Sequence, residues 1–405
     1  MASIISATTT SGLVSTADNS GDLQFQTQNG ANTITLPSSS GTLATTANLS
    51  GLGFKNRIIN GNMTIDQRNA GASITNSGAN NQFPVDRFGI WGQVASKYTA
   101  QQNAGSVTPP AGFTNYLGIT SSSAYTPLGA NDLYMVAQQI EGFNTADLNW
   151  GTANAKTITL SFWVRSSGLT YPATFGGSLQ NSAVDRSYPF AYTISAANTW
   201  EQKSITIPGD ISGTWVGATN GVGIRVWFAL GVGTNYSGTA GAVAGWAGAD
   251  YRSVTGATNV LETNGATFYI TGVQLEVGST ATSFDYRPFT TELQLAQRYF
   301  CTSYVLGTAV GTITADGRVG RYVDATSNFA AVQIFYPVSM RAAPTVTIYG
   351  ILAGGTAGQV SGDSINKSGA VSPSGSTRQT FAYANNVSTG TNEGISCNFI
   401  ASAEL

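Results

Sequence analysis

The sequence predicts an all-β protein that consists of an N-terminal β-hairpin attachment segment, a central antiparallel sandwich, a short linking helix and a smaller C-terminal β-domain. Composition is the first observation behind this prediction. Only 9% of the 405 residues are charged and 48 are glycines, which favours short strands and tight turns over long helices. In addition, apolar and polar residues alternate in several runs of strand length, and strands do not alternate with long helices along the chain.

Residues 1–54 form the first segment, which is rich in Ser, Thr, Asn and Gly. The run DLQFQTQNGANTITLP, residues 22–37, has alternating apolar residues on both sides of Asn29-Gly30, a strong signal for a hairpin turn. The segment has too few apolar side chains to offset the entropy of ordering it alone. We therefore expect it to share a core with identical copies in a parallel homotrimer. A flexible tail is the alternative, because the composition is also compatible with disorder.

Residues 55–289 are expected to form the central sandwich. A shorter strand, SITIP, is expected at 204–208, and Gly272 predicts a β-bulge within a strand at 266–277. Asn60-Gly61 predicts a two-residue hairpin turn. Two further runs alternate clearly, TITLSFWVRS from residue 157 and GIRVWFALG from residue 223. Their predicted core residues are Ile158, Leu160, Phe162 and Val164 in the first run, and Ile224, Val226, Phe228 and Leu230 in the second.

The linking segment, residues 290–304, carries a helix pattern from about residue 291 to residue 302. Thr291 is suited to cap its start, while Glu292 in the first turn and Arg298 near the end complement the helix dipole. Beyond it, the runs VQIFYPV and TVTIYG predict a smaller β-domain over residues 305–405. In a parallel trimer all C-termini lie at one end, so we expect this domain to be the distal tip.

The complete absence of histidine excludes several classes of enzyme. Ser-His-Asp and Cys-His triads and His-ligated zinc sites are impossible, and we expect no catalytic residues, no metal site and no cofactor. A glycosidase that uses two carboxylates stays open. Cys301 and Cys397 are too few for a zinc knuckle or a disulfide scaffold, so we expect them to be small buried residues.

Charge and hydropathy limit the partners of the chain. The formal net charge is −2 and the basic residues are scattered, so nucleic-acid binding is not expected. No run approaches the ~20 apolar residues that cross a bilayer, and the N-terminus lacks the features of a signal peptide. Asp86 with Arg87, and Asp285 with Arg287, lie beside aromatic residues. We interpret both as partly buried ion pairs that fix loops, with a polar ligand contact as the alternative.

Several blocks of sequence resemble a known family. In order, they are KNRIINGNMTIDQRNAG from Lys55, VDRFGIW, LSFWVRSS, ITIPGDISGTW and FYITGVQLEVGSTATSFDYRPFTTELQLAQRYF. Together they cover about residues 55–300 and resemble tail-fibre and minor virion proteins of tailed bacteriophages. The central domain of that family is similar to galactose-binding-like, carbohydrate-binding modules, so the resemblance implies a jelly-roll sandwich. The family provides no agreed catalytic or binding residues that could be carried over to this chain.

The resemblance implies a protein of the virion, made in the host cytoplasm without a signal peptide. We expect a homotrimeric tail fibre that binds a host surface glycan and catalyses no reaction. Its N-terminal segment is expected to attach to other phage tail or virion proteins. A capsid-attached fibre or a baseplate component without a receptor role is one alternative. A glycan depolymerase is the other, and it would need a cleft with paired carboxylates.

The candidate glycan-binding residues are Trp and Arg side chains on the outer faces of two strands, together with aromatics in a Gly-rich stretch at 231–259. An indole ring offers a flat platform for a sugar, and a guanidinium offers several fixed donors. A loop can equally carry recognition residues. The alternative is that loops or a neighbouring subunit cover these faces. The candidates are Trp163, Arg165, Arg225, Trp227, Trp246 and Tyr251.

Overall fold

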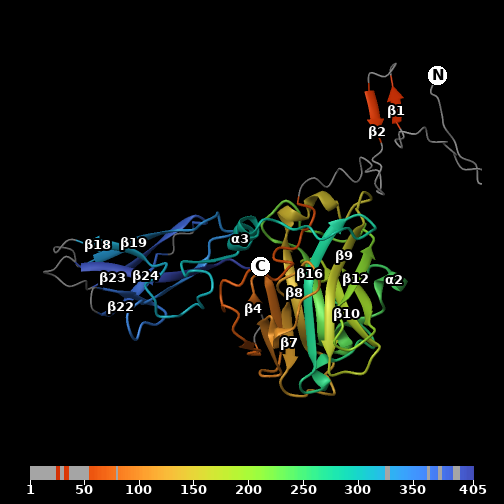
Figure 1. Cartoon of the computed structure of the whole chain (residues 1–405), viewed down its shortest axis with the longest axis horizontal. Helices are drawn as coiled ribbons and strands as arrows, with labels where there is room; N and C mark the ends of the chain where they lie inside the picture. Colours follow the sequence, from red (N-terminus) through yellow and green to blue (C-terminus); the bar gives the residue numbers. More distant parts are fainter. Residues whose placement is uncertain are drawn as a thin grey trace, which may run out of the picture. The chain divides into compact units, whose positions relative to one another are not determined.

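The structure is a computed structural model that describes residues 24–27, 32–35, 54–78, 81–323, 329–362, 365–372, 376–385 and 393–405 (Figure 1). The chain forms two units, Met1–Phe54 and Lys55–Leu405. In the first unit, β1 (Gln24–Thr27) and β2 (Asn32–Thr35) pair in antiparallel fashion. This pairing confirms the two predicted strands. The predicted turn at Asn29-Gly30 lies outside the described residues.

The second unit begins with a β-sandwich of two six-stranded sheets, whose strand pairs are antiparallel. The first sheet has the order β11-β10-β13-β8-β5-β4 and the second the order β12-β9-β16-β7-β6-β3. The sequence prediction of an all-β sandwich is therefore confirmed. The first sheet contains β4 (Gln82–Val85), β5 (Phe88–Gly92), β8 (Leu133–Glu141), β10 (Ala173–Gln180), β11 (Ser187–Ile194) and β13 (Val222–Val232). The second contains β3 (Ile74–Thr75), β6 (Tyr98–Gln102), β7 (Leu117–Ser121), β9 (Ile158–Ser167), β12 (Glu201–Ile207) and β16 (Thr267–Val277).

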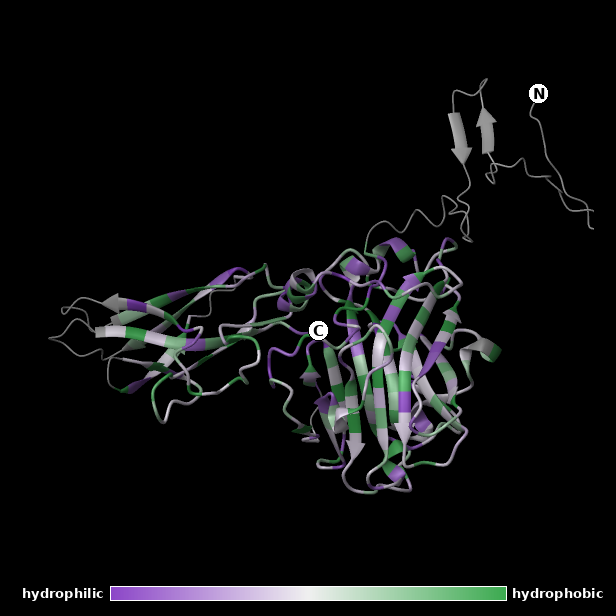
Figure 2. Cartoon of the chain, in the orientation of Figure 1, coloured by the Kyte–Doolittle hydropathy of each residue, from purple (hydrophilic) through white to green (hydrophobic). Residues whose placement is uncertain are grey.

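The core lies between the two sheets and contains the residues that strand alternation predicted. Phe162 on β9 and Phe228 on β13 meet edge to face across the sandwich, with ring centroids 5.1 Å apart. All eight predicted core residues are at most 1% exposed. Figure 2 colours the ribbon by hydropathy and shows apolar and polar residues alternating along β9. Burial of alternate side chains therefore explains both long strands.

The bulge in β16 is confirmed at Gly272. The pairing of β16 with β9 shifts between Thr271 and Gln274. Gly272 has a φ of +60°, and a Cβ there would lie 2.7 Å from Cζ of Phe113 and 3.0 Å from Cδ1 of Trp163. Glycine is required at this position both for its backbone conformation and for the space that it leaves.

The hairpin predicted at Asn60-Gly61 is wrong, because residues 55–67 contain no strand. Asn60 does adopt a positive φ of 60°. However, its amide donates to the carbonyls of Ile65 and Asp86, and the carbonyl of Gly61 accepts from the N–H of Val273. Side chains and β16 therefore supply hydrogen-bond partners for the backbone of this segment, and no second strand pairs with it to form a hairpin.

The linking helix is shorter than predicted and begins earlier. Helix α3 spans Phe289–Gln297, with Pro288 at its N-cap position, so Thr291 lies inside the helix and does not cap it. Phe300–Thr302 are not helical but form β17, which pairs with β24 (Glu393–Ser402). Tyr299, between the two elements, is 1% exposed. Long-range strand pairing therefore overrides the local helical pattern at the end of the segment.

The C-terminal β-structure is organised around β24. One half of β24 pairs with β18 and β21, and the other half pairs with β17 and β20. Cys301 and Cys397 are free and buried in its core, as predicted. The remaining strands are β18 (Val319–Val323), β19 (Phe329–Phe335), β20 (Thr345–Tyr349), β21 (Gln359–Ser361), β22 (Asn366–Val371) and β23 (Gln379–Asn385).

The last residues of the chain return to the sandwich. The carboxylate of Glu404 forms ion pairs with Arg68, at 2.8 Å, and with Arg87. The amide of Gln139, on β8, donates to the carbonyl of Leu405 at 3.0 Å. Residues 305–405 were expected to form the distal tip of a trimer, and in the single chain their terminal residues lie beside the sandwich. Chain order therefore does not measure distance from the sandwich within this domain.

Candidate functional site

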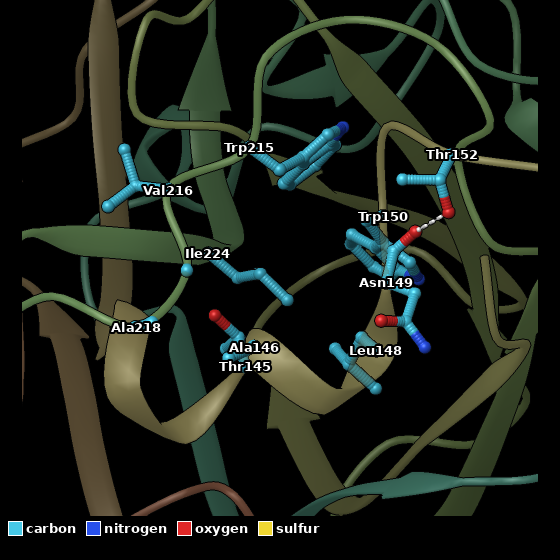
Figure 3. A pocket seen from close by; sticks show the side chains of 11 residues that line it. Thr145, Ala146, Leu148, Asn149, Trp150, Thr152, Trp215, Val216, Ala218 and Ile224 are labelled. Carbon is cyan, nitrogen blue, oxygen red and sulfur yellow. Dashed lines mark hydrogen bonds between the residues drawn. The ribbon is translucent and has the colours of Figure 1, made fainter. Parts of the chain in front are cut away.

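A cavity of about 350 Å³ lies at the edge of the sandwich, between the short 3-10 helix Ala146–Leu148 and the connection from β12 to β13. Figure 3 shows the rings of Trp150 and Trp215 on one side of this cavity and Val216 on the opposite side. Ile224 from β13 closes part of it. We call this cavity the Trp150–Trp215 pocket. Its size and its mixed apolar and polar lining are typical of a site for a small ligand.

Hydrogen bonds hold both tryptophans of the pocket in place. The indole N–H of Trp150 donates to the carbonyl of Lys156 at 2.8 Å. The indole N–H of Trp215 lies 3.3 Å from Oδ2 of Asp210 and 3.2 Å from the carbonyl of Ser212. The two rings meet edge to face, with centroids 4.6 Å apart. Because their polar atoms already have partners, the rings form a rigid apolar wall.

An ion pair anchors the loop that carries Trp215. Arg186 donates to both carboxylate oxygens of Asp210, at 2.7 and 2.6 Å, and Asp210 is 1% exposed. The loop is also tied to the opposite wall, since the N–H of Gly151 donates to the carbonyl of Asp210 at 2.7 Å. The pocket is thus formed before any ligand arrives, which lowers the entropic cost of binding.

Uncharged polar groups complete the pocket. Asn149 is exposed at its rim in the left-handed conformation, with a φ of 53°, and Thr152 donates its hydroxyl to the backbone carbonyl of Asn149 at 2.7 Å. Ala218, in the opposite wall, also has a left-handed φ of 54°. None of the eleven lining residues is Asp, Glu, Lys or Arg. The pocket therefore combines flat rings with neutral hydrogen-bonding groups.

Trp246 belongs to the same aromatic cluster. Its ring lies 5.2 Å from that of Trp150 and 5.3 Å from that of Trp215, in both cases edge to face. Its N–H donates to the carbonyl of Pro208 at 2.8 Å. Trp246 thus supports the pocket from behind and does not line it. Tyr251, in the same Gly-rich stretch, packs against Gly238, where a Cβ would lie 2.4 Å from its ring.

The two other Trp-Arg pairs lie on opposite sheets and do not form one site. Trp163 and Arg165 are half-buried on the outer face of β9, as strand parity predicted. Arg165 donates to Oδ1 of Asn198 at 2.7 Å and lies over the ring of Tyr269. This outer face keeps an accessible indole at Trp163.

Trp227, on β13, is covered. It is 3% exposed, and its N–H donates to Oε1 of Gln180 at 2.7 Å. Arg252, from the Gly-rich stretch, lies over its ring at 5.2 Å. The neighbouring Arg225 donates to the carbonyls of Asn181 and Ser182. The stretch 231–259 therefore packs on the sheet of its own chain, and the ring of Trp227 is inaccessible to a sugar.

Trp150 and Trp215 were not among the sequence candidates. Both lie outside the strands, in the runs LNWG and SGTW, where the alternation of apolar and polar residues cannot identify exposed side chains. The available signal was a tryptophan next to glycine and small polar residues in a loop, the setting in which binding residues are concentrated. That signal does not reveal that two such loops meet.

Of the two predicted ion pairs, Asp285 with Arg287 is present, whereas Asp86 and Arg87 each pair with another residue. Asp86 pairs with Arg68 at 2.5 Å, and Arg87 pairs with Glu404. Burial raises the pKa of Asp86 to about 6, against the opposing effect of Arg68. Arg287 contacts Glu292 at 3.2 Å and Asp285 at 3.9 Å. These groups fix the junction between the sandwich and the segments that follow it.

Within the ranges given above, no group of three or more His, Cys, Asp or Glu could hold a metal ion. In the same part of the chain, no helix is long and apolar enough to cross a membrane.

No family model and no curated protein matches the chain. Among solved structures, it is similar to the enzymatically active domain of tailspike protein 4 of bacteriophage CBA120, with 10% identity and a TM-score of 0.28. That match covers 55% of this chain and 21% of the tailspike chain, so this chain spans about a fifth of it. A CBM4 structure matches 54% of this chain and 98% of its own, with 15% identity and a TM-score of 0.26.

A third structure, the tandem CBM22-1–CBM22-2 domain of Paenibacillus barcinonensis Xyn10C, matches 83% of this chain and 99% of its own. The identity is 8% and the TM-score is 0.26. TM-scores of this size do not establish a shared fold. The sandwich is instead defined by its own strand order and register.

Proposed function

We propose that this protein is a non-catalytic, glycan-binding attachment protein of a tailed bacteriophage, and that the Trp150–Trp215 pocket takes part of a host surface glycan. The observation that carries the proposal is the partly exposed indole of Trp215, braced by the buried indole of Trp150, in a pocket of about 350 Å³ with neutral polar groups at its rim. The apolar face of a pyranose stacks on such rings, while its hydroxyls bond to amide and hydroxyl groups.

The absence of charge in the pocket favours binding over hydrolysis. A glycosidase needs two carboxyl groups about 5 to 10 Å apart, on either side of the scissile bond. Neither Asp nor Glu lines this pocket. The carboxylate of Asp210 accepts hydrogen bonds from Nε and Nη2 of Arg186. A carboxylate held in this way stabilises the loop and is poorly placed to transfer a proton.

The assignment to the virion rests on the sequence blocks from Lys55 that resemble phage tail fibres. The antiparallel pair β1–β2 agrees with an attachment segment that carries little apolar surface. In a homotrimer, three weak sites would act together and reach an avidity that one site lacks. We propose tail-fibre attachment through the N-terminal segment. Immunogold labelling of particles would locate the chain, and label on the capsid alone would contradict this part of the proposal.

Glycan binding can be tested with the full-length protein on an array of neutral and charged bacterial surface polysaccharides. Replacing Trp215 by Ala is expected to lower the affinity about tenfold, because it removes one face of the pocket. The exposed amide of Asn149 offers a milder change. Asn149→Gly suits the left-handed backbone, leaves the core intact and should weaken binding by less.

Phe335→Ala is the matched control, because this aromatic side chain is 65% exposed on β19 of the C-terminal domain. It should leave binding unchanged. Circular dichroism would verify that each variant is folded. Unchanged array binding by folded Trp215→Ala and Asn149→Gly would show that the pocket does not carry glycan recognition.

A further inference from the structure

A second concave region runs beside the start of helix α3, away from the Trp150–Trp215 pocket. It consists of two cavities of about 250 and 230 Å³, both of which are lined by Thr64 and Phe289. The first also contacts Phe113 and Tyr286, and the second contacts Gln102 and Leu306. We call the two cavities together the Phe289 groove. Since they share two lining residues, the cavities adjoin each other.

Exposed aromatic rings line the groove. Tyr286 is 55% exposed and Phe289 is 50% exposed. Tyr286, Phe113 and Phe284 form a cluster whose ring centroids are 4.9 to 5.7 Å apart. Tyr286 is held in place by its hydroxyl, which donates to the carbonyl of Gly112 at 2.8 Å. Water contacts these rings although other parts of the chain hold them rigidly, which is typical of a recognition surface.

The cluster reaches one of the sequence candidates. Gly272 lies between the rings of Phe113 and Trp163, because a Cβ added to this glycine would come within 3.0 Å of both rings. Trp163 is half-buried on the outer face of β9. The aromatic surface therefore extends from Trp163 through Phe113 to Tyr286 and Phe289.

Uncharged polar groups in the groove keep unused hydrogen-bonding capacity. Among the described residues, Oδ1 of Asn62 is buried without a hydrogen-bond partner, although Asn62 lines the cavity. A buried acceptor without a partner is costly and is usually explained by a missing ligand or water. Thr114 in the same cavity uses its hydroxyl hydrogen for Asn115 but keeps an accepting lone pair.

The charged groups at the groove already have hydrogen-bond or ion-pair partners within the chain. Asp66 accepts hydrogen bonds from the backbone N–H groups of Asn69 at 2.9 Å and Gly71 at 2.7 Å. Glu292 and Arg287 pair with each other at 3.2 Å. What remains free is a set of ring faces and neutral hydrogen-bonding atoms, which matches an uncharged sugar better than an acidic one.

We propose that the Phe289 groove is a second carbohydrate site, which takes a linear, uncharged oligosaccharide across the ring of Phe289. Two consecutive cavities suit two neighbouring sugar units, with Tyr286 and Phe289 as stacking platforms. The site rests on the same ligand class as the proposed function, but it uses other residues on another part of the sandwich. Each chain would then offer two points of contact to one polymer.

Native electrophoresis of the full-length protein through gels that contain xylan, mixed-linkage β-glucan, galactomannan or dextran tests the proposal. The double variant Tyr286→Ala/Phe289→Ala removes two exposed rings. It should lower the affinity about fivefold to tenfold in the gel that retards the wild type most. Trp215→Ala should retain part of the retardation. Phe335→Ala serves as the control for loss of an exposed aromatic side chain.

The proposal that the Phe289 groove binds carbohydrate would be overturned if the double variant were retarded as much as the wild type. It would also be overturned if Trp215→Ala alone lost all retardation. No retardation of the wild type in any of the four gels would also overturn it. The pocket is judged separately on the array, which includes charged glycans. The alternative occupant of the groove is a second copy of the chain. Sedimentation of the double variant tests this alternative, because a change in subunit number would show that the groove is a contact between copies.

Discussion

Glu404 is expected to stabilise the whole second unit, although it is the penultimate residue of the chain. Its carboxylate is 9% exposed and pairs with Arg68, which is 13% exposed, and with Arg87, which is 2% exposed. Arg87 also lies over the ring of Tyr299 at 3.6 Å. Glu404→Gln leaves the guanidinium of Arg87 buried without an anionic partner among the described residues. Breaking a buried pair in this way costs about 3 to 5 kcal/mol.

The measurement is denaturant unfolding of the full chain, followed by tryptophan fluorescence. All seven tryptophans lie between residues 91 and 246, so this signal reports the sandwich and not the C-terminal domain. The double variant Glu404→Gln/Arg87→Met should recover much of the lost stability, because it no longer buries an unpaired charge.

The matched control is Asp147→Asn, which breaks the pair with Arg57. Those atoms are 2.7 Å apart, but the Asp147 side chain is 53% exposed, so the cost should stay below about 1 kcal/mol. If Glu404→Gln costs no more than Asp147→Asn, the reasoning from burial at the junction is refuted. The same holds if Arg87→Met fails to rescue it.

Four further predictions concern the rest of the molecule. Because burial raises the pKa of Asp86 to about 6, its contribution to stability is complete below its ordinary pKa of 3.8 and is lost as the pH rises through about 6. The difference in unfolding free energy between the wild type and Asp86→Asn should therefore fall by about 3 kcal/mol between pH 3 and pH 7, and a flat difference would contradict the raised pKa. Gly272→Ala should lower stability by about 1 to 3 kcal/mol in thermal unfolding, because of its φ of +60° and the nearby rings; an unchanged melting temperature would argue against the bulge. Trp227→Ala should cost about 3 to 5 kcal/mol and leave glycan binding of the folded protein unchanged, whereas selective loss of binding would place a site on that face. Sedimentation equilibrium of the full chain should give three times 41.9 kDa, and a stable monomer at micromolar concentration would exclude the trimer.

The sequence predicted those parts of the fold in which one physical effect dominates. In β9 and β13, alternate side chains must be buried between two sheets, and their period of two is visible in the sequence. The bulge at Gly272 was predictable for the same reason, since a glycine interrupts an otherwise regular strand.

Predictions failed where a distant segment competes with a local preference. Asn60-Gly61 has the residues of a hairpin turn, but β16 supplies the backbone partners of this segment. The helical pattern after Pro288 continues to residue 302, yet Phe300–Thr302 pair with β24, about a hundred residues later in the chain. Neither partner can be identified from the local sequence, because pairing depends on the arrangement of the complete fold.

The candidate site also depends on contacts between segments that are distant in the sequence. Strand parity correctly placed the side chains of Trp163 and Trp227 outside the core of the sandwich, but facing outward is not the same as being exposed. Arg252 and its neighbours cover Trp227, whereas Trp163 remains half-buried. In a chain with long Gly-rich connections, an outward-facing ring on a central strand is readily covered by the chain itself. A loop at the margin of the sheets leaves part of the Trp215 ring accessible, whereas Trp150, on the neighbouring loop, is only 7% exposed and lies edge to face against it. These two residues are far apart in sequence and become neighbours only because the Asp210 segment bridges their loops, so their pairing follows from the fold and not from either sequence run.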